Sequence, residues 1–297
     1  MSGCVFVVGA GGRLGAAIVD GFGDRKVIAH TRATLDITDA AAVMRAVEAV
    51  APAVIVNCAA FNRVDEAEDR PIDALAVNAF AVRSLARAAE AVNAVLVHYG
   101  SDFVFDGDAT EPYSEEARPS PRSTYGLSKL LGDWLALDAT TGFVLRVESL
   151  FGCVPGQRPR RGSLDAIIEA MEQGRTASVF TDRVVSPSYV DDVVRATRYL
   201  IEAHAPPGLY HCVNSGRATW YEVAEEAARL LGIVPRLEPI TLDSHAMKAA
   251  RPRFCALANR KLAGAGFVMP SWKDALGRWL ASRDSSIRQG TIGRVHG

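Results

Sequence analysis

Two side chains with complementary acid–base properties stand four residues apart in the stretch YGLSK, residues 125–129. Tyr125 and Lys129 would share one face of a helix, since residues four apart are neighbours there. A phenol, with a pKa of about 10, can donate its proton, and an adjacent ammonium stabilises the phenolate that remains. With seven Tyr and five Lys in the chain, chance produces this spacing about 0.1 times. The pair is a candidate proton donor, although the motif alone is weak evidence.

A second candidate site is the glycine-rich stretch GAGGRLG, residues 9–15, which lies between an apolar run and an amphipathic one. Glycine permits a tight turn, close approach of a pyrophosphate to the backbone, and close packing of helix on strand. The free N–H groups of the helix N-terminus then bind the anion. A plain turn is the alternative, but the flanking strand and helix favour a dinucleotide site. The residues assigned to it here are Gly9, Gly12, Arg13, Leu14 and Gly15.

The second apolar run decides which dinucleotide is expected. It ends in His30-Thr31-Arg32, without the acidic residue that would bind the ribose hydroxyls of NAD. Arg32 is suited to pair with a 2′-phosphate, so NADPH is the expected cofactor, with NADH also accepted. The alternative is that Arg32 is an exposed loop residue.

Short apolar runs alternate with longer helical stretches through the first half of the chain. Strands that are apolar throughout are buried on both faces, which is typical of a parallel sheet covered by helices. With right-handed crossovers, the pattern predicts an α/β, Rossmann-type doubly wound parallel sheet over residues 1–153. The expected strands are 4–8, 26–30, 53–57, 94–98 and 143–147, and the expected helices are 13–22, 39–50, 72–92 and 125–137.

After residue 153 the alternation loosens. A basic loop is expected at 155–161, and helices are expected at 163–173, 190–201, 220–231, 259–264 and 271–280. We predict a smaller mixed α/β substrate-binding region over 154–281, with the chain crossing back to the first domain around 183–204. Residues 282–297 have weak periodicity and predict a flexible tail.

Composition excludes several classes of protein. The net charge of −1 lacks the basic surplus that nucleic acid requires. The five Cys are scattered without a CxxC pair, so neither a zinc site nor a disulfide framework is expected, and no metal is assigned. No apolar run approaches the ~18 residues that span a bilayer, and there is no basic leader, so no membrane partner and a cytoplasmic location are expected.

The motifs taken together resemble the dTDP-4-dehydrorhamnose reductase family, within the extended short-chain dehydrogenase/reductase superfamily. The resemblance covers residues from about 3 to 280. Besides the two stretches above, it rests on LDITD (35–39), VIVNCAA (54–60), VDEAE (64–68), AVNAFA (76–81), HYGSDFVFDG (98–107), LRVESLFG (145–152), WYEVA (220–224) and ARP (250–252). The phrase SDFVFDG is the most specific of these.

The resemblance implies roles for particular residues. Ser101, Tyr125 and Lys129 would form the catalytic set, with Tyr125 and Lys129 also contacting the cofactor. The cofactor would further touch Asp36, Ile37, Cys58, Ala59 and Ala60. The substrate would touch Val64, Asp65, Asp102, Phe103, Ser149 and Arg251. For LDITD the alternative is an ordinary helix cap, and for Arg251 a surface salt bridge.

The implied reaction is reduction of a ketone, the 4-keto group of a nucleotide-activated deoxysugar in dTDP-rhamnose biosynthesis. Tyr125 would supply the proton, and the Ser101 hydroxyl would stabilise the developing alkoxide from a strand end. Related dehydratases carry an adjacent acidic pair where this chain has Asp102 followed by Phe103. The incomplete pair favours reduction over elimination of water.

One segment departs from the family. Relatives commonly read Thr-Ser-Trp where this chain has Val147-Glu148-Ser149, so the sugar pocket is expected to differ. Two alternative functions stay open: a sugar-nucleotide epimerase or dehydratase that retains NAD, and a non-catalytic, NADP-binding regulatory subunit resembling the methionine adenosyltransferase beta subunit. The expected partners are a nucleotide sugar and a second copy of the chain in a homodimer.

Overall fold

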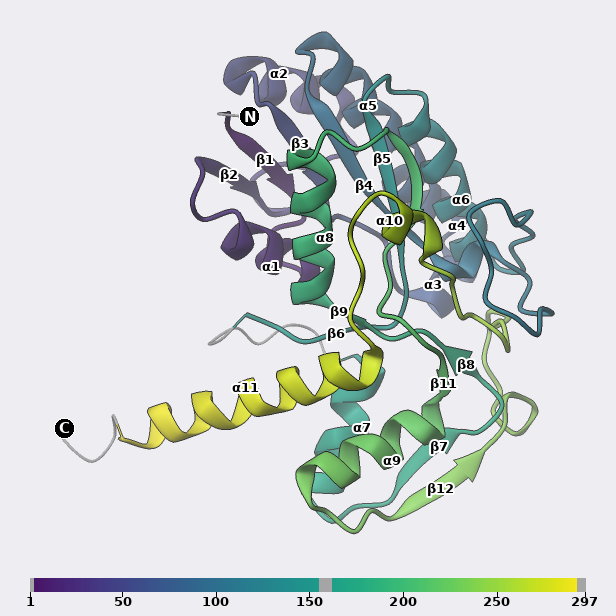
Figure 1. The fold of residues 1–297 in the computed structure, drawn as a ribbon. Coiled ribbons are helices and arrows are strands. Elements are labelled where there is room, and N and C mark those ends of the chain that lie inside the picture. The colour runs from purple at the N-terminus through teal and green to yellow at the C-terminus, as the bar shows by residue number, and fades with distance from the viewer. Residues whose placement is uncertain (1–2, 155–161, 293–297) are drawn as a thin grey trace.

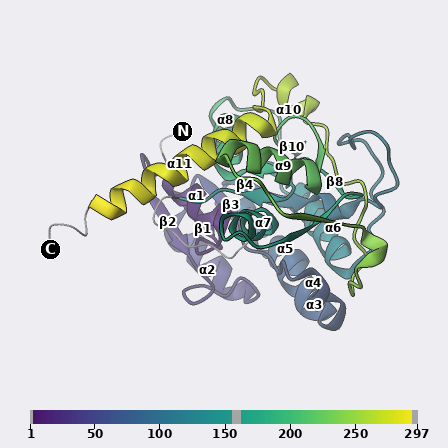
Figure 2. The ribbon, with the colours of Figure 1, turned by 90° about the horizontal axis from the view of Figure 1, so that it is seen from below.

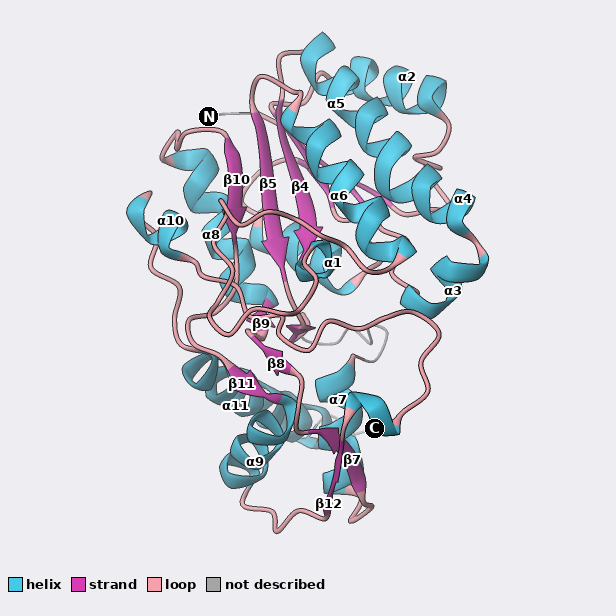
Figure 3. Cartoon of the chain, turned by 90° about the vertical axis from the view of Figure 1, so that its right-hand side faces the viewer, coloured by secondary structure: helices cyan, strands magenta, loops and turns pink. Residues whose placement is uncertain are grey.

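A computed structural model describes residues 3–154 and 162–292, with side chains as far as Arg283. Its centre is a six-stranded sheet in the order β10-β5-β4-β3-β1-β2, and every neighbouring pair is parallel (Figure 3). The predicted parallel sheet is therefore confirmed. Its strands are β1 (Val5–Val8), β2 (Val27–His30), β3 (Val54–Asn57), β4 (Val95–Ser101), β5 (Gly142–Val147) and β10 (Gly208–His211).

Helices cover both faces of this sheet (Figure 1). One face carries α1 (Arg13–Gly21) and α8 (Val190–Glu202), which pack against each other. The other face carries α2 (Ala40–Val50), α5 (Ala81–Ala91) and α6 (Thr124–Leu137). This arrangement is the doubly wound fold that the alternation of strands and helices predicts.

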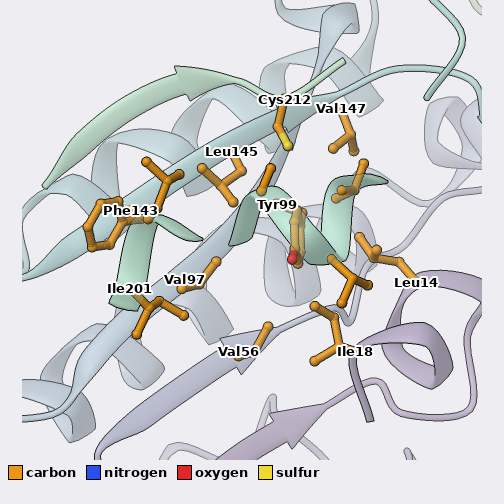
Figure 4. Close-up of a cluster of buried hydrophobic side chains, with 14 of the residues drawn as sticks. Leu14, Ile18, Val56, Val97, Tyr99, Phe143, Leu145, Val147, Ile201 and Cys212 are labelled. Atoms are coloured by element: carbon orange, nitrogen blue, oxygen red, sulfur yellow. The ribbon is translucent and has the colours of Figure 1, made fainter. Parts of the chain in front are cut away.

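The strand side chains show why the runs are apolar throughout. Val5 and Val7 of β1 lie in the cluster beneath α1 and α8, while Phe6 and Val8 lie in the cluster beneath α2 and α5. Successive strand residues point to opposite faces, and here both faces are covered. Figure 4 shows the first cluster, to which Leu14 and Ile18 of α1 and strand residues such as Val97 and Leu145 belong. Each large side chain buried in this way contributes roughly 1.5–3 kcal/mol.

Strand β4 is longer than predicted, because it continues past His98 to Ser101. Pairing with β5 extends to its last residue, where Ser101 lies opposite Val147. Buried His98 is tolerated in the strand because its Nδ1 lies 3.0 Å from Asn57 Nδ2, on the neighbouring strand β3. The extension brings Ser101 to the carboxyl edge of the sheet.

The helix predicted over 72–92 is interrupted. It begins as α4 (Pro71–Leu75), widens into a π-helical turn over Ala76–Phe80, and continues as α5. The wide turn contains Asn78, whose side chain is fully buried and bonded to other segments. Such turns recur at functional sites, and this one faces α6.

Below the sheet lies a smaller body, which we call the second lobe (Figures 1 and 3). Its buried cluster joins side chains of the lobe's helices, among them Ile168, Trp220 and Trp279. The lobe consists of α7 (Ser163–Glu172), β7 (Ala177–Phe180), β8 (Val184–Val185), β11 (Ala218–Thr219), α9 (Trp220–Leu231), β12 (Leu237–Ile240) and α11 (Trp272–Ile292). Smaller elements at its border or beside the sheet are β6 (Leu150–Phe151), β9 (Ser188–Tyr189), α3 (Val64–Asp69) and α10 (Arg260–Gly264).

The chain passes between the two bodies more than once. After β8 it returns to the sheet, where α8 packs on α1 and β10 pairs with β5. We propose to retain the division into a dinucleotide-binding domain over 1–153 and a substrate-binding region over 154–281. The basic loop predicted at 155–161 lies outside the described residues.

The C-terminal prediction needs a correction. A helix ending at Leu280 and a flexible tail from residue 282 were expected, but α11 continues to Ile292. Its first turns are held by Trp272, Leu276 and Trp279 in the second lobe's cluster, and the later turns project beyond the body (Figure 2). Residues 293–297 lie outside the described residues. Within 3–154 and 162–292, no helix has both the length and the apolar character needed to cross a membrane.

Candidate active site

A cavity of about 610 Å³ opens where β1, β2 and β3 end. In this strand order β2 lies on one side of β1 and β3 on the other, and ligands of open α/β sheets bind at such a reversal. Eight of the predicted cofactor residues line the cavity: Gly9, Gly12, Arg32, Asp36, Ile37, Cys58, Ala59 and Ala60. Sequence reasoning missed several further lining residues, including Thr31, Leu35, Phe61 and Val77.

The glycine loop has the geometry that an anion site requires. Gly9 has φ +77°, and a Cβ atom there would lie 2.5 Å from Ala59 N. A Cβ atom on Gly15 would lie 2.2 Å from Gly9 O, so glycine lets α1 approach the loop. Gly12 closes the turn by donating its N–H to Gly9 O at 3.0 Å and precedes the first residue of α1. The N-terminus of α1 therefore adjoins the cavity, which Gly9, Gly11 and Gly12 line.

Two predicted cofactor side chains point elsewhere. The Arg13 guanidinium contacts Gly152 O and the Asp165 carboxylate, at the border of the second lobe. Leu14 is buried in the cluster beneath α1 and α8 (Figure 4). Helix α1 begins at Arg13, and its periodicity directs these two side chains away from the cavity. Contact through their backbone N–H groups stays a proposal.

Arg32 and Asp36 are both exposed at the far end of the cavity, after β2. The Asp36 carboxylate accepts hydrogen bonds from the Thr38 hydroxyl at 2.7 Å and from Thr38 N at 3.0 Å. These bonds lower the pKa of Asp36, and the positive charge of Arg32 adds to the effect. The Asp36 carboxylate thus shapes its own turn, while the helix cap that the alternative interpretation of LDITD expects is formed by Asp39, which accepts from Ala42 N at 2.9 Å.

Two asparagines hold the loop that follows β3. Asn57 Oδ1 accepts from Ala59 N at 3.1 Å, and Asn78 Oδ1 accepts from Phe61 N at 2.8 Å. The Asn78 amide also donates to Ser128 Oγ of α6 at 2.9 Å. Asn78 therefore ties the cavity to the helix that carries Tyr125. Sequence reasoning gave Asn78 no role, although the AVNAFA motif contains it.

Tyr125 lies in the first turn of α6, which Ser123 caps by accepting from Gly126 N at 3.1 Å. The phenol is enclosed between Ser101 and the ring of Phe103, whose centroid lies 5.3 Å from that of Tyr125, edge to face. Burial raises the pKa of Tyr125, and a hydrogen bond with Ser101 opposes the shift. The phenol therefore holds its proton at neutral pH, as a proton donor must.

Lys129 is 3% exposed, and its ammonium donates to Tyr99 O at 2.5 Å. Burial lowers the pKa of Lys129 to about 8, while the negative charge of Asp133 opposes the shift. Asp133 is one helical turn further along α6 and accepts from Arg146 Nε at 2.9 Å. Asp133 was missed, although its spacing of four from Lys129 is a readable signal.

The predicted substrate residues come from segments far apart in the sequence. Asp65 of α3 accepts from Ala249 N at 2.9 Å and pairs with Arg251 at 2.8 Å. Burial opposes ionisation, but these two partners hold the pKa of Asp65 below its usual range. Val64 begins α3 and is partly buried. Ser149, between β5 and β6, has the left-handed φ of +45°.

Phe103 connects this group to the catalytic set. The guanidinium carbons of Arg183 and Arg251 lie 5.5 Å and 5.8 Å from its ring centroid. Asp102 is only 4% exposed and accepts from the Ser101 hydroxyl at 3.0 Å. Its carboxylate therefore faces inward, beside Glu148 and Arg183, which sequence reasoning gave no role.

The comparisons with known proteins agree with this geometry. Residues 3–284 match the family model of the RmlD substrate binding domain, and the chain belongs to that family. It is 38% identical over 281 residues to dTDP-4-dehydrorhamnose reductase of Streptomyces griseus. This alignment covers 91% of this chain and 90% of that protein. It is 34% identical over 277 residues to dTDP-4-keto-6-deoxy-D-glucose reductase of Streptomyces niveus, covering 91% and 94%.

Among solved structures, dTDP-4-dehydrorhamnose reductase from Bacillus anthracis in complex with NADP has the same fold. The TM-score is 0.88 at 29% identity, over 95% of this chain and 100% of that one.

Proposed function

We propose that this member of the family is an NADPH-dependent reductase of the 4-keto group of a nucleotide-activated deoxysugar. One observation carries the proposal: Ser101, Tyr125 and Lys129 meet at the end of β4, next to the loop that lines the cofactor cavity. Many dehydrogenases share such a cavity, whereas this set can deliver a proton to a carbonyl oxygen. The names of the two Streptomyces relatives support the same chemistry.

The residues at the cavity fit NADPH. The glycine loop at the start of α1 leaves the backbone room to approach its pyrophosphate, and Arg32 at the far end suits its 2′-phosphate. NADH lacks that phosphate and is accepted less well. The Bacillus anthracis relative in complex with NADP supports this assignment.

The chain's own residues hold and move the proton. NADPH, when bound, supplies a hydride to the carbonyl carbon. The Ser101 hydroxyl and the Tyr125 phenol meet the negative charge that develops on the carbonyl oxygen, and Tyr125 then donates its proton. Lys129, one helical turn away, stabilises the phenolate that forms. Burial of Ser101 and Lys129 strengthens these interactions, because little water competes.

The substrate side is formed by Val64, Asp65, Phe103, Ser149 and Arg251. We assign Arg251 to the diphosphate of the nucleotide, since a guanidinium binds phosphate with two parallel hydrogen bonds. Its ion pair with Asp65 holds the guanidinium in place until the substrate arrives. The relatives named above act on dTDP sugars, so a dTDP-4-keto-6-deoxy sugar is the proposed substrate. Ser149 leaves more room than the tryptophan that the resemblance leads one to expect.

The test follows NADPH absorbance in the presence of a panel of dTDP-4-keto-6-deoxy sugars. Tyr125→Phe should lower kcat by roughly 10²–10⁴-fold with little change in NADPH affinity, since only the proton donor is lost. Tyr221→Phe, the same change in the second lobe, is the control and should leave kcat unaltered. A wild-type protein that oxidises NADPH with none of these sugars would overturn the proposal.

The alternatives give different outcomes in the same assay. An epimerase or dehydratase would be purified with bound NAD and would turn over without added NADPH. A regulatory subunit would bind NADPH and show no turnover. Phe103, in place of a second acid, favours reduction.

Two further proposals concern the whole protein. We propose a homodimer, for which the exposed apolar side chains of α6 and the neighbouring π-helical turn are the candidate surface. The cytoplasmic location stays a prediction.

A further inference from the structure

Two buried carboxyl groups stand behind the catalytic serine. Asp102 is 4% exposed and Glu148 is 2% exposed. Their oxygens and the Cys255 sulfur all lie within 4.8 Å of one another. Among the described residues, neither Asp102 Oδ2 nor Glu148 Oε1 has a hydrogen-bond partner. Two ionised carboxylates this close together, and this well shielded from water, would repel each other strongly.

Only one full positive charge stands against the pair. Arg183 acts on both carboxyl groups, and its guanidinium donates to Cys255 Sγ at 3.8 Å. The other titratable groups that face the pair are the Cys255 thiol, which donates to Pro252 O at 3.3 Å, and the Tyr125 phenol. Arg251 lies near the ring of Phe103 and pairs with Asp65 instead. One cation balances one carboxylate, so the second carboxyl group is neutral and carries a proton.

Burial raises the pKa of both carboxyl groups. Burial raises the pKa of Asp102, and Arg183 opposes the shift. Burial raises the pKa of Glu148 further, the charge of Asp102 adds to it, and the hydrogen bond from Ser186 N, at 2.7 Å, opposes it. Both directions agree with one proton held between the two groups at neutral pH.

A continuous path joins this proton to the reacting tyrosine. The Ser101 hydroxyl donates to Asp102 Oδ1 at 3.0 Å and also lies within hydrogen-bonding reach of the Tyr125 phenol. Phe103 N donates to Ser101 Oγ at 3.2 Å and holds the hydroxyl between them. When Tyr125 is a phenolate, the Ser101 hydroxyl can turn its proton from Asp102 toward Tyr125, and Ser101 Oγ can then accept a proton from the carboxyl pair.

We propose that Asp102 and Glu148 share one proton and, through Ser101, form the internal source that restores the Tyr125 phenol after each reduction. The inference rests on the proposed reductase function. Asp102 and Glu148 act through Ser101, so they are positioning residues and touch neither substrate nor cofactor. This changes the predicted role of Asp102, which the resemblance placed at the substrate.

The proton count closes over one turnover. The ketone carbon gains a hydride from NADPH and is reduced, and the Tyr125 O–H bond breaks as the O–H bond of the alcohol forms. The phenolate takes the Ser101 proton, and Ser101 takes the shared proton of the carboxyl pair. The pair then recovers one proton from water as the product leaves.

A bound cation is a poorer account of the same cluster. The Arg183 guanidinium already supplies the positive charge there, and the Cys255 thiol uses its proton to bond Pro252 O. Burial also raises the pKa of Cys255, which keeps the sulfur protonated and a weak ligand.

Infrared spectroscopy tests the shared proton without any substrate. At neutral pH the infrared spectrum of the folded wild-type protein should contain the C=O stretching band of one protonated carboxyl group. This band should persist when the pH of the solution is changed. Glu148→Gln should remove this band, since the isosteric amide leaves Asp102 alone beside Arg183. Glu48→Gln, the same change on the exposed surface of α2, should retain it. Absence of the band from the wild-type spectrum would refute the shared proton.

Kinetics tests the route to Tyr125. In Glu148→Gln, the first reduction should proceed at a rate within about twofold of wild type, since Tyr125 starts protonated, whereas steady-state kcat should fall about tenfold or more. Glu148→Asp, which keeps a carboxyl group, should recover part of kcat. Equal loss in the first and later turnovers, or no loss in either, would reject the relay. A wild type without ketone reduction would instead count against the proposed function, and the infrared result would still stand.

Discussion

Tyr125 and Lys129 act from enclosed positions, and burial shifts their pKa values in opposite directions. The phenol is held in its protonated form, while the pKa of the ammonium falls to about 8. The neutral form of each is favoured for the same reason, because a buried charge loses its hydration. Asp133 is the group that keeps Lys129 charged.

This balance predicts the alkaline limb of the pH profile. As the pH rises through about 8, Lys129 loses its proton and its stabilising charge, so kcat should fall. Asp133→Asn removes the opposing carboxylate, and the midpoint of the fall should move to lower pH. Asp138→Asn, at the exposed end of the same helix, is the control. Steady-state rates across pH measure the effect, and an unmoved midpoint in Asp133→Asn would contradict it.

Arg32 sets the cofactor preference in our assignment. Arg32→Ala should lower the ratio of kcat/KM with NADPH to kcat/KM with NADH by roughly ten- to a hundredfold, as loss of a charged hydrogen bond implies. Arg45→Ala, an exposed change on α2, should leave that ratio unaltered. If Arg32→Ala and Arg45→Ala had the same ratio, Arg32 would not bind the 2′-phosphate and would be an ordinary exposed residue.

Among the secondary-structure elements, the close approach of α1 to the glycine loop forms the cofactor site. Gly15 leaves no space for a side chain, because a Cβ atom there would meet Gly9 O. The π-helical turn at Asn78 also shapes the site, because the Asn78 side chain links the loop after β3 to α6. The first depends on a close approach of backbone and the second on hydrogen bonds of the Asn78 side chain, and neither uses a charged group.

Gly15→Ala should therefore push α1 away from the loop. We expect a loss of about 1–3 kcal/mol in the free energy of unfolding, as for an overpacked site, together with weaker NADPH binding. Gly277→Ala, where a Cβ atom meets nothing within 4 Å, should instead stabilise α11 by roughly 0.5–1 kcal/mol. Denaturant unfolding and NADPH titration measure the two effects. Equal behaviour of the two variants would rule out the packing argument.

In the whole molecule, the second lobe and the sheet are joined through the site. Arg251 reaches Asp65 from 186 positions away, and α8 returns the chain to the sheet after β8. The exposed surface of α6 and of the π-helical turn beside it carries Phe80, Leu127 and Trp134, which are 58%, 46% and 54% exposed. Large apolar side chains gathered in this way are typical of a surface that another protein covers.

We predict that this surface joins two copies of the chain. Trp134→Asp should convert a dimer to a monomer, because it introduces a charge twice across a symmetric contact. Val234→Asp, at a position 94% exposed in the second lobe, should leave the dimer intact. Sedimentation of both variants and of wild type measures the state, and a monomeric wild type would disprove the prediction.

Most of the sheet could be predicted from the sequence, because hydrophobic periodicity is a local signal that burial on two faces makes strong. The predictions went wrong where tertiary contacts override that signal. β4 continues past His98 because β5 pairs with it, the helix at Asn78 widens to meet Phe61 and Ser128, and α11 runs past residue 282.

The sequence by itself determined the glycine loop and the helical face shared by Tyr125 and Lys129. Each depends on residues close together in the chain, so spacing alone specifies their geometry. Only the tertiary structure brought Asp102, Glu148 and Arg183 into one buried group and paired Asp65 with Arg251. The charge of a buried carboxyl group depends on neighbours that the fold selects from distant segments, and no local pattern records them.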